Sequence, residues 1–340
     1  MHKLKSILDH ILAIESSCDD TSAAIIAGGV VISNKVATQE VHENYGGVVP
    51  ELASREHIQK IIPVVSQALE EAKIELSDLK AIAVTRGPGL LGSLIVGVTF
   101  AKSLAQSLKI PIIEVQHMQA HVMANFAGVE KPKFPFICLT VSGGHTQLVL
   151  VENYLKMSIL GQSIDDAAGE AFDKTGKMLG LKYPAGPLID QLAKAGNACF
   201  KFPKSKVGKH EFSFSGFKTS VMYFLRKETN KNENFIPENV NDICASIQSS
   251  ICETLIEKLS FAAKEVGVTT IALAGGVSAN SELRTRFQKL CEDGNYVGFV
   301  PPISLCTDNA GMIGLVGWYK YLERDFSDLS IAPAPRLSFI

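Results

Sequence analysis

The sequence predicts an α/β fold of two similar lobes, and three observations support this prediction. Residues 138–151 form a strand, a tight turn at Ser142-Gly143-Gly144 and a second strand, and residues 11–26 repeat this shape around a polar turn. A third apolar run ends in the turn Gly275-Gly276. Two hairpins with polar tips, followed by this third turn, indicate two related lobes that face one nucleotide.

The adjacent glycines of the central hairpin favour a ligand site. Without Cβ atoms at Gly143 and Gly144, backbone N–H groups can approach a ligand closely, and successive free N–H groups attract anions such as phosphate. A single glycine pair is more often only a turn, so the hypothesis depends on the repetition of the pattern along the chain.

The overall composition is that of a globular enzyme with one to three domains, two being the main expectation for 340 residues. Hydrophobic residues make up 46% and charged residues 20%, which is enough apolar material for a sizeable core. The formal net charge of −2 neither requires nor excludes nucleic acid, so any basic surface must be local.

The cysteines and the apolar runs indicate a cytosolic protein. Seven scattered cysteines without a C-x-x-C pair favour reduced thiols over disulfides or a cysteine zinc site. The apolar run near the N-terminus is broken by Asp9 and His10, so no signal peptide is expected. No uninterrupted apolar run of about 18 residues occurs, and no membrane span is expected.

Strands and helices alternate along the chain. Pro63 is expected to kink or interrupt the first helix, and the glycines of residues 86–93 provide either an anion site at a helix start or close helix packing. The expected strands are 11–15, 23–26, 30–36, 81–85, 111–115 and the arms of the central hairpin; the expected helices are 51–73, 93–108, one opening at His117, one from Asp190, 243–266, 282–290 and one from about 307. Residues 230–241 are expected to be a surface excursion, and the tail after Asp325 irregular.

Two histidines lie four residues apart at the start of a predicted helix. His117 and His121 therefore share one face and can bind one cation, although such spacing is as often accidental. A zincin protease needs a glutamate directly after the first histidine, and Met118 stands there. A third ligand must come from elsewhere, and Asp308 is a candidate, although an aspartate before a helix is more often a cap.

Two further charged segments allow functional and structural interpretations. Residues 166–174 place Asp166, Glu170, Asp173 and Lys174 near one helical face, as an ionisable cluster or as a solvated surface. Residues 201–218 alternate lysines with phenylalanines, which suits either nucleic-acid binding or a loop anchored to the core by its aromatic residues.

Taken together, the motifs resemble the TsaD/OSGEP family, the tRNA threonylcarbamoyladenosine synthases that were once named O-sialoglycoprotein endopeptidases. The resemblance covers about residues 9–335. It is carried by the motifs at residues 15–21, 45–55, 87–90, 117 with 121, 141–146, 165–174, 212–216, 274–280 and 306–309. The sequence departs from the family pattern at Asp20, where a glutamate is usual, at Gln116, where a histidine is common, and at Ala185, where a glycine is usual.

The resemblance implies an actin/Hsp70/sugar-kinase-like (ASKHA) fold with two lobes, each a mixed sheet flanked by helices. Residues 1–134 would form the first lobe, with about 316–340 packing back on it. Residues 135–315 would form the second lobe, with a helical insertion at about 160–240.

The resemblance also implies transfer of the threonylcarbamoyl group from threonylcarbamoyl-AMP to N6 of adenosine 37, in tRNAs that read ANN codons. Metal ligation would fall on His117, His121 and Asp308, with iron or zinc as the ion. Contact with the substrate or nucleotide would fall on Thr140, Val141, Ser142, Gly143, Gly144, Asp173, Gly186, Asp190 and Asn280. Asp19, Asp20 and Glu15 are the candidates for acid or base.

The expected partners are tRNA and proteins resembling TsaB and TsaE, with a TsaC-like enzyme supplying the adenylate, and no membrane. Two other functions remain open at this point. One is a regulatory or chaperone-like ATP-binding module of the same fold, which would need no metal site. The other is a metallopeptidase, which Met118 disfavours.

Overall fold

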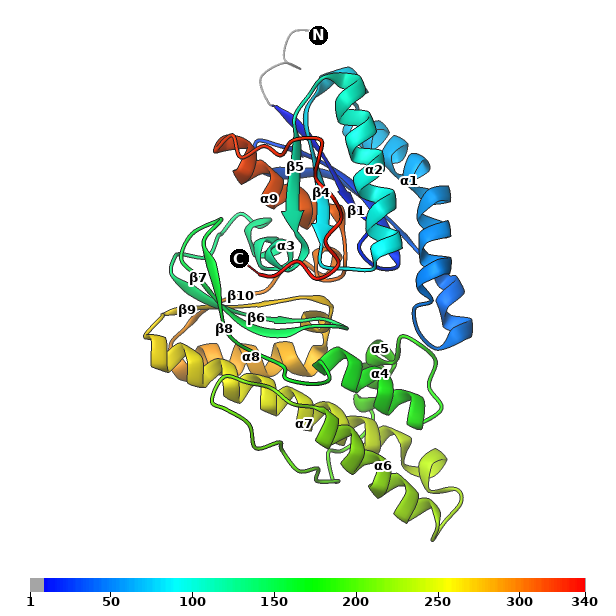
Figure 1. The fold of residues 1–340 in the computed structure, drawn as a ribbon. Coiled ribbons are helices and arrows are strands. Elements are labelled where there is room, and N and C mark those ends of the chain that lie inside the picture. The colour runs from blue at the N-terminus through cyan, green and yellow to red at the C-terminus, as the bar shows by residue number, and fades with distance from the viewer. Residues whose placement is uncertain (1–8, 340) are drawn as a thin grey trace. The chain divides into compact units, whose positions relative to one another are not determined.

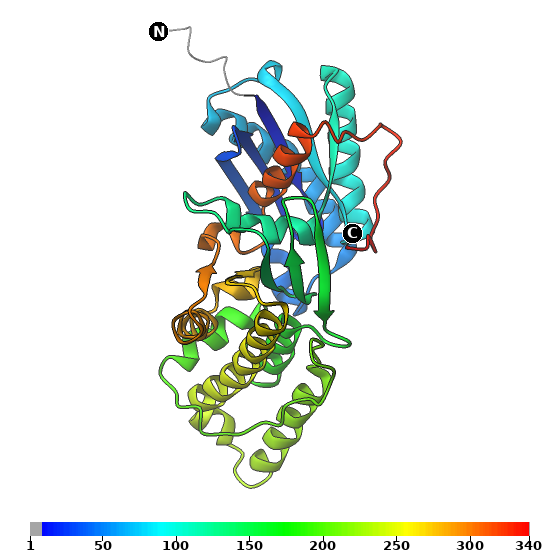
Figure 2. The ribbon, with the colours of Figure 1, turned by 90° about the vertical axis from the view of Figure 1, so that its left-hand side faces the viewer.

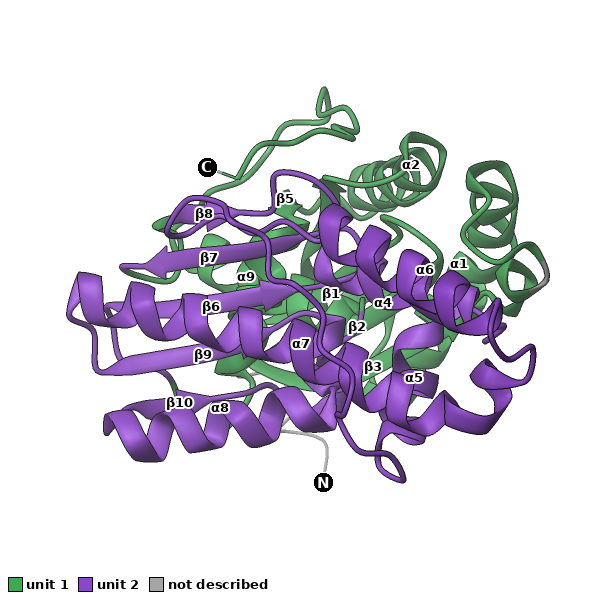
Figure 3. Ribbon diagram, turned by 90° about the horizontal axis from the view of Figure 1, so that it is seen from below, with its two compact units in different colours: residues 1–131, 153–157, 308–340 green, residues 132–152, 158–307 purple. Residues whose placement is uncertain are grey.

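The computed structural model describes residues 9–339, which divide into two compact units (Figure 3). Among these residues, unit 1 comprises 9–131, 153–157 and 308–339, and unit 2 comprises 132–152 and 158–307. The first residues of the chain, on which the expectation of no signal peptide partly rests, lie outside the described range.

Unit 1 is built on a five-stranded mixed sheet in the order β3-β2-β1-β4-β5 (Figure 1). Its strands are β1 (His10–Glu15), β2 (Asp20–Ala27), β3 (Val30–Thr38), β4 (Leu79–Gly87) and β5 (Ile112–Gln116). The first three strands are antiparallel neighbours, while β4 and β5 run parallel to β1. The predicted first hairpin and third strand are therefore confirmed.

Helices cover both faces of this sheet, which explains why β1 is apolar at successive positions. Leu12 and Ile14 lie in one core with α1 (Pro50–Ala72) and α2 (Leu91–Leu108). The opposite face, with Ala13, packs against α9 (Ala310–Leu322), where a Cβ on Gly314 would lie 2.2 Å from Ile26. α9 thus approaches the sheet more closely than a side chain at position 314 would allow.

Two helices of unit 1 bear on the predictions of a break at Pro63 and of no membrane span. α1 continues through Pro63, so the predicted interruption is wrong. α2 is long and apolar enough to pass as a membrane span by length and composition, and one such helix is weak evidence for a membrane. Its residues Leu94, Val98 and Ala101 are buried, the latter two in the core beneath the sheet.

Unit 2 repeats the strand scheme in the order β10-β9-β6-β7-β8. Its strands are β6 (Phe136–Val141), β7 (Thr146–Val151), β8 (Met157–Gln162), β9 (Thr270–Ala274) and β10 (Val297–Phe299). β6 and β7 form an antiparallel hairpin, β9 runs parallel to β6, and β10 runs parallel to β9. Both units thus follow one chain path through the sheet, as the repeated turns predicted.

The helices of unit 2 are α4 (Ala168–Met178), α5 (Ala185–Ala193), α6 (Ser215–Thr229), α7 (Phe235–Val266) and α8 (Ser281–Gly294). α4 to α7 occupy the connection between β8 and β9, where unit 1 has α1 as its long helix. α7 begins at Phe235, inside the predicted surface excursion, because Phe235 and Ile236 pack on the core. α5 begins at Ala185, so the prediction of a helix start at Asp190 is wrong.

The loop before α6 is anchored by its aromatic residues. Phe212, Phe214 and Phe217 are at most 5% exposed and belong to the core of unit 2. Lys204 is paired with Glu253 and Glu257 of α7 at 3.1 and 2.5 Å. The geometry therefore supports the anchored loop rather than a set of rings exposed for base stacking.

In unit 1, α3 (His117–Met123) follows β5 directly. The C-terminal part of the chain returns to unit 1 with α9, which is capped by Asn309; the Asn309 side chain accepts a hydrogen bond from Met312 N at 3.0 Å. After α9 the tail is irregular, as predicted, and runs along α2 and β4 (Figures 1 and 2), where Lys102 donates to Ile331 O. All seven cysteines are free thiols.

Candidate functional site

Three potential metal ligands converge in unit 1. α3 places His117 and His121 on one face, with ring centroids 4.7 Å apart and planes at 86°. Asp308 Oδ1 lies 3.3 Å from His117 Nε2 and 3.2 Å from His121 Nε2. Asn309 rather than Asp308 caps α9, so the Asp308 carboxylate is not used by the helix and faces both imidazoles.

The three groups fit a transition-metal ion. Ligands about 2.0–2.2 Å from a common ion are roughly 3.0–3.6 Å apart, which matches the two separations from Asp308. All three ligand atoms lie within 4.8 Å of one another. Both ring nitrogens of His121 are buried without a hydrogen bond, although Nε2 is close to Asp308. A cation would give the orphaned Nε2 the partner that the protein does not supply.

A buried carboxylate stands behind the first imidazole. Glu15, the last residue of β1, is 0% exposed, and its Oε2 accepts from His117 Nδ1 at 2.9 Å. The same oxygen accepts from Thr85 Oγ1 of β4 at 2.7 Å. Its other oxygen accepts from the backbone N–H of Ser17. Glu15 therefore connects β1, β4, α3 and the turn after β1.

The electrostatics of this cluster favour a positive charge at its centre. Burial alone would lower the pKa of His117, but Asp308 and Glu15 raise it well above its ordinary value. Burial alone would raise the pKa of Asp308, but the two histidines hold it well below its usual range. Burial lowers the pKa of His121, which keeps that imidazole neutral. The cluster thus favours a positive charge beside Asp308, which a bound cation would supply.

The turn between β1 and β2 carries the other predicted acids. Asp19 is partly exposed, and Asp20 opens β2 opposite Thr38. Burial, and then the charge of Asp308, raise the pKa of Asp20 to about 7. An acid with this pKa exchanges protons near neutral pH, which general acid–base catalysis requires.

Two buried side chains hold this turn from behind. The carbonyl of Cys18 accepts from His57 Nε2 of α1 at 2.9 Å and from Ser93 Oγ of α2 at 3.0 Å. His57 Nδ1 is 2.8 Å from Thr21 Oγ1, and burial lowers the pKa of His57. The neutral ring is therefore a fixed link between α1 and the turn.

In unit 2, the glycines of the β6–β7 turn face open space. Ser142 N donates to His145 O at 2.8 Å and closes the turn. No heavy atom lies within 4 Å of a Cβ built on Gly143 or Gly144, and neither residue has a positive φ. Neither packing nor backbone conformation therefore requires glycine here, and the space is available to a ligand.

Neighbouring groups in unit 2 fix the position of this turn. Thr140 and Val141, at the end of β6, are fully buried. A Cβ on Gly169 of α4 would lie 2.4 Å from Ser142 O, and one on Gly275 would lie 2.4 Å from Val141 O. These two glycines are structural, because they let α4 and the end of β9 approach the turn.

The remaining predicted nucleotide contacts lie at the starts of α5 and α8 or contact them. Asp173 Oδ1 accepts from Ala185 N at 2.8 Å and so caps α5, which contains Gly186 at its second position. Asn280 caps α8 by accepting from Leu283 N, and its amide donates to Gln248 Oε1 at 2.6 Å. Asp190 Oδ1 accepts from Ser281 Oγ at 2.6 Å, so Asp190 and Asn280 meet at the start of α8.

The charged segment around α4 is a structural junction rather than a simple solvated face. Asp166 binds Lys174 of α4 at 3.0 Å and Lys218 of α6 at 2.7 Å. Asp165, its neighbour, accepts from Ser213 Oγ and from Phe214 N at the start of α6. Asp173 does not join this group, because it caps α5.

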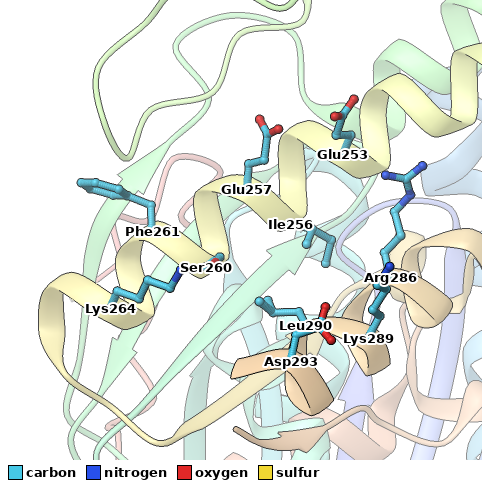
Figure 4. Close-up of a pocket in the computed structure, with 10 residues that line it drawn as sticks. All are labelled: Glu253, Ile256, Glu257, Ser260, Phe261, Lys264, Arg286, Lys289, Leu290 and Asp293. Carbon is cyan, nitrogen blue, oxygen red and sulfur yellow. The ribbon is translucent and has the colours of Figure 1, made fainter. Parts of the chain in front are cut away.

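A pocket of about 450 Å³ lies between α7 and α8 (Figure 4). Ile256 and Leu290 form part of its lining, with Lys264, Lys289 and Asp293 among the charged groups around them. None of the predicted site residues lines it, so the motifs of the sequence do not assign it a role.

The sequence analysis missed the interactions behind the site. Glu15 was named only as a possible acid or base, while Thr85 and His57 were given no role at the site. Each is a polar residue within an apolar strand or on the buried face of a helix, and this is the one signal that marks them before the structure is known.

Two units with the same strand order, a His-His-Asp cluster in one and glycine turns at strand ends in the other, define an ASKHA-like α/β protein with a candidate metal centre. The TsaD family profile, described as "tRNA N6-adenosine threonylcarbamoyltransferase", matches residues 30–315. The chain belongs to this family of acyltransferases.

Relatives and solved structures agree with this placement. The tRNA N6-adenosine threonylcarbamoyltransferase of Christiangramia forsetii is 56% identical over 97% of this chain and 98% of its own length. That of Cytophaga hutchinsonii is 54% identical over 96% of each chain. Full-length HypF in its phosphate- and nucleotide-bound form has a TM-score of 0.60 at 14% identity over 93% of this chain, which spans 47% of the HypF chain and supports the fold alone.

Proposed function

We propose that this chain transfers the threonylcarbamoyl group from threonylcarbamoyl-AMP to N6 of adenosine 37 in tRNAs reading ANN codons. The N6 amine attacks the carbamoyl carbon, the bond from that carbon to the phosphate oxygen breaks, and AMP leaves. A base takes the proton that the amine loses. The proposal rests on family membership together with one observation, the convergence of His117, His121 and Asp308.

The three ligands would hold one divalent ion, Fe²⁺ or, as the alternative, Zn²⁺. Two imidazoles and one carboxylate leave coordination positions open, which suits a catalytic rather than a structural site. The ion would act as a Lewis acid on an oxygen of the donor. The protein's own contribution is to hold the ligands: α3 fixes the imidazole pair, and the cap by Asn309 leaves Asp308 available.

The nucleotide part of the donor, or ATP and ADP, would bind at unit 2. The turn at Ser142, Gly143 and Gly144 offers backbone N–H groups to phosphate, with no side chain at either glycine. Gly186 and Asn280, at the starts of α5 and α8, would add further contacts to the nucleotide, with Asp173 and Asp190 beside them.

Asp20 is the preferred base, with Asp19 beside it. Burial raises the pKa of Asp20 to about 7, so its carboxylate can accept a proton near neutral pH. The carboxyl atom Asp20 Oδ1 has no hydrogen-bond partner among the described residues, so its capacity to accept a proton is unused.

The partners would be tRNA and proteins resembling TsaB and TsaE, with a TsaC-like enzyme supplying the adenylate, all in the cytoplasm. Adenosine 37 lies in the anticodon loop, where an unpaired base is presented at low energetic cost. The structure favours neither alternative function: an ATP-binding module would not need the His-His-Asp cluster, and Met118 occupies the place of a zincin's catalytic glutamate.

Nucleoside analysis tests the proposal directly. Purified chain is incubated with threonine, bicarbonate, ATP, unmodified tRNA and the partner proteins, and the modified nucleoside is quantified. The wild-type chain is expected to form threonylcarbamoyladenosine, and H117A/H121A to form none while retaining its fold by circular dichroism. Full activity in the double variant would remove the metal from the scheme, and no product with the wild-type chain would refute the transferase itself.

A further inference from the structure

Glu15 is a charged side chain without solvent contact. Its carboxylate is 0% exposed at the end of β1, in the middle of the unit 1 sheet. Burying an isolated carboxylate is very unfavourable, so its partners must compensate. The compensation comes from three hydrogen bonds, donated by Thr85 Oγ1, His117 Nδ1 and the backbone of Ser17.

These hydrogen bonds determine which nitrogen His117 presents to the candidate metal centre. Because Nδ1 points at Glu15 Oε2 at 2.9 Å, Nδ1 carries the proton and Nε2 faces Asp308. Only an unprotonated ring nitrogen can bind an ion, so the hydrogen bond selects the tautomer with Nε2 as the ligand. It also fixes the rotation of the ring, because the two ring nitrogens are held at opposite ends.

Thr85 in turn fixes the carboxylate. Its hydroxyl donates to the oxygen that binds His117, and Thr85 itself is fully buried in β4. Ser17 N holds the other oxygen, so neither oxygen is free to rotate away. His121 has no comparable support, because neither of its ring nitrogens has a hydrogen-bond partner. The two histidines are therefore held by different means.

We propose that Glu15, held by Thr85, is a positioning residue that orients His117 as a metal ligand, rather than the acid or base of the reaction. This inference rests on the metal centre of the proposed function. It places a carboxylate–imidazole–metal relay in unit 1, running from Thr85 through Glu15 and His117 to the ion. A carboxylate that accepts three hydrogen bonds and is shielded from solvent is poorly placed to take a proton from a substrate.

Zinc affinity, measured by chelator competition, tests the relay without any turnover. E15L removes the acceptor, and we expect its zinc affinity to fall about 10- to 100-fold, the range typical of lost outer-shell partners. T85V removes one donor to Glu15 and is expected to lower the affinity less, whereas T85S keeps the hydroxyl and restores it. E114Q is the matched control, because Glu114 is a carboxylate of neighbouring β5 that pairs with Arg86 instead.

A second readout reports on the imidazole itself. In zinc-loaded protein labelled with ¹⁵N-histidine, the Nδ1 proton of His117 is expected at low field and in slow exchange with water, and E15Q is expected to move it upfield. His117 is assigned by the loss of its signals in H117N. A merely structural role of Glu15 would not move this signal in a folded variant.

The outcomes separate the two proposals. If E15L and T85V bind zinc as tightly as wild type, and the Nδ1 proton of His117 does not shift, the relay is overturned and the metal centre stands. No zinc binding by the wild-type chain overturns the metal centre and the relay together. If E15L does not fold, T85V against wild type decides, because a methyl group replaces the hydroxyl there, and T85S shows whether the hydroxyl alone suffices.

Discussion

At the scale of single residues, the clearest evidence for a ligand is a glycine that the protein itself does not need. Gly275 is required, since its φ is +83° and a Cβ would collide with Val141 O. Gly144 has neither constraint. A glycine free of both constraints, at a turn between two strands, fits our proposal that a ligand approaches its backbone.

This contrast predicts opposite effects of two similar substitutions. G144A is expected to leave the free energy of unfolding unchanged or to raise it by about 0.5 kcal/mol, because alanine restricts the unfolded chain. It is expected to weaken ATP binding at least tenfold, because the methyl group enters the space for phosphate. Urea unfolding and calorimetric titration with ATP measure the two effects.

G275A is the control for that experiment. It is expected to lower the free energy of unfolding by more than 1 kcal/mol, because alanine is strained at this φ and meets backbone atoms. Unchanged ATP affinity in a stable G144A would show that the turn does not contact the nucleotide.

At the scale of elements, the helical insertion of unit 2 shares an apolar core with the sheet, and charged contacts join two of its helices to each other. Asp166 lies between β8 and α4 and binds one lysine from α4 and one from α6. Burial alone would raise the pKa of Asp166, but Lys218 and Lys174 together hold it below its ordinary value. The ionised carboxylate is therefore the form that joins α4 to α6.

The stabilisation by Asp166 is expected to depend on pH. Since the pKa is lower in the folded state than the ordinary value of 3.8, this contribution is fully present above about pH 4 to 5 and is lost as the pH falls through the lowered value. D166N is expected to lower the free energy of unfolding by about 1 kcal/mol at pH 7. Near pH 3 the difference in stability between D166N and wild type is expected to be smaller. Urea midpoints at both pH values measure this, and an equal deficit at both would contradict the role of the charge.

At the scale of the whole molecule, the candidate metal centre depends on the return of the chain to unit 1. His117 and His121 follow β5, while Asp308 comes after the whole of unit 2, and the structure places all three in unit 1. An ion bound to them would link α3 to the start of α9 across a very long loop of chain. Binding would therefore couple to the stability of unit 1.

Metal loading is expected to raise the melting temperature. A ligand at 100 times its dissociation constant stabilises the folded state by about 2.7 kcal/mol. We expect Zn²⁺ to raise the melting temperature and EDTA to reverse the shift, measured by scanning fluorimetry. D308N should abolish the response, whereas D325N, at an exposed position after α9, should retain it. An equal zinc response in D308N would place the ion elsewhere.

The sequence by itself determined the local features of this protein: the hairpins, the glycine turns, the helices of unit 1, the imidazole pair on α3 and the family. Each of these depends on neighbours a few residues away, so periodicity and motif spacing suffice to predict them. Only the tertiary structure decided that Asn309 caps α9 and leaves Asp308 to the histidines, that Asp190 lies inside α5, and that Glu15 supports His117. These outcomes depend on which distant segments meet, because a buried polar group takes the partner that the fold brings to it.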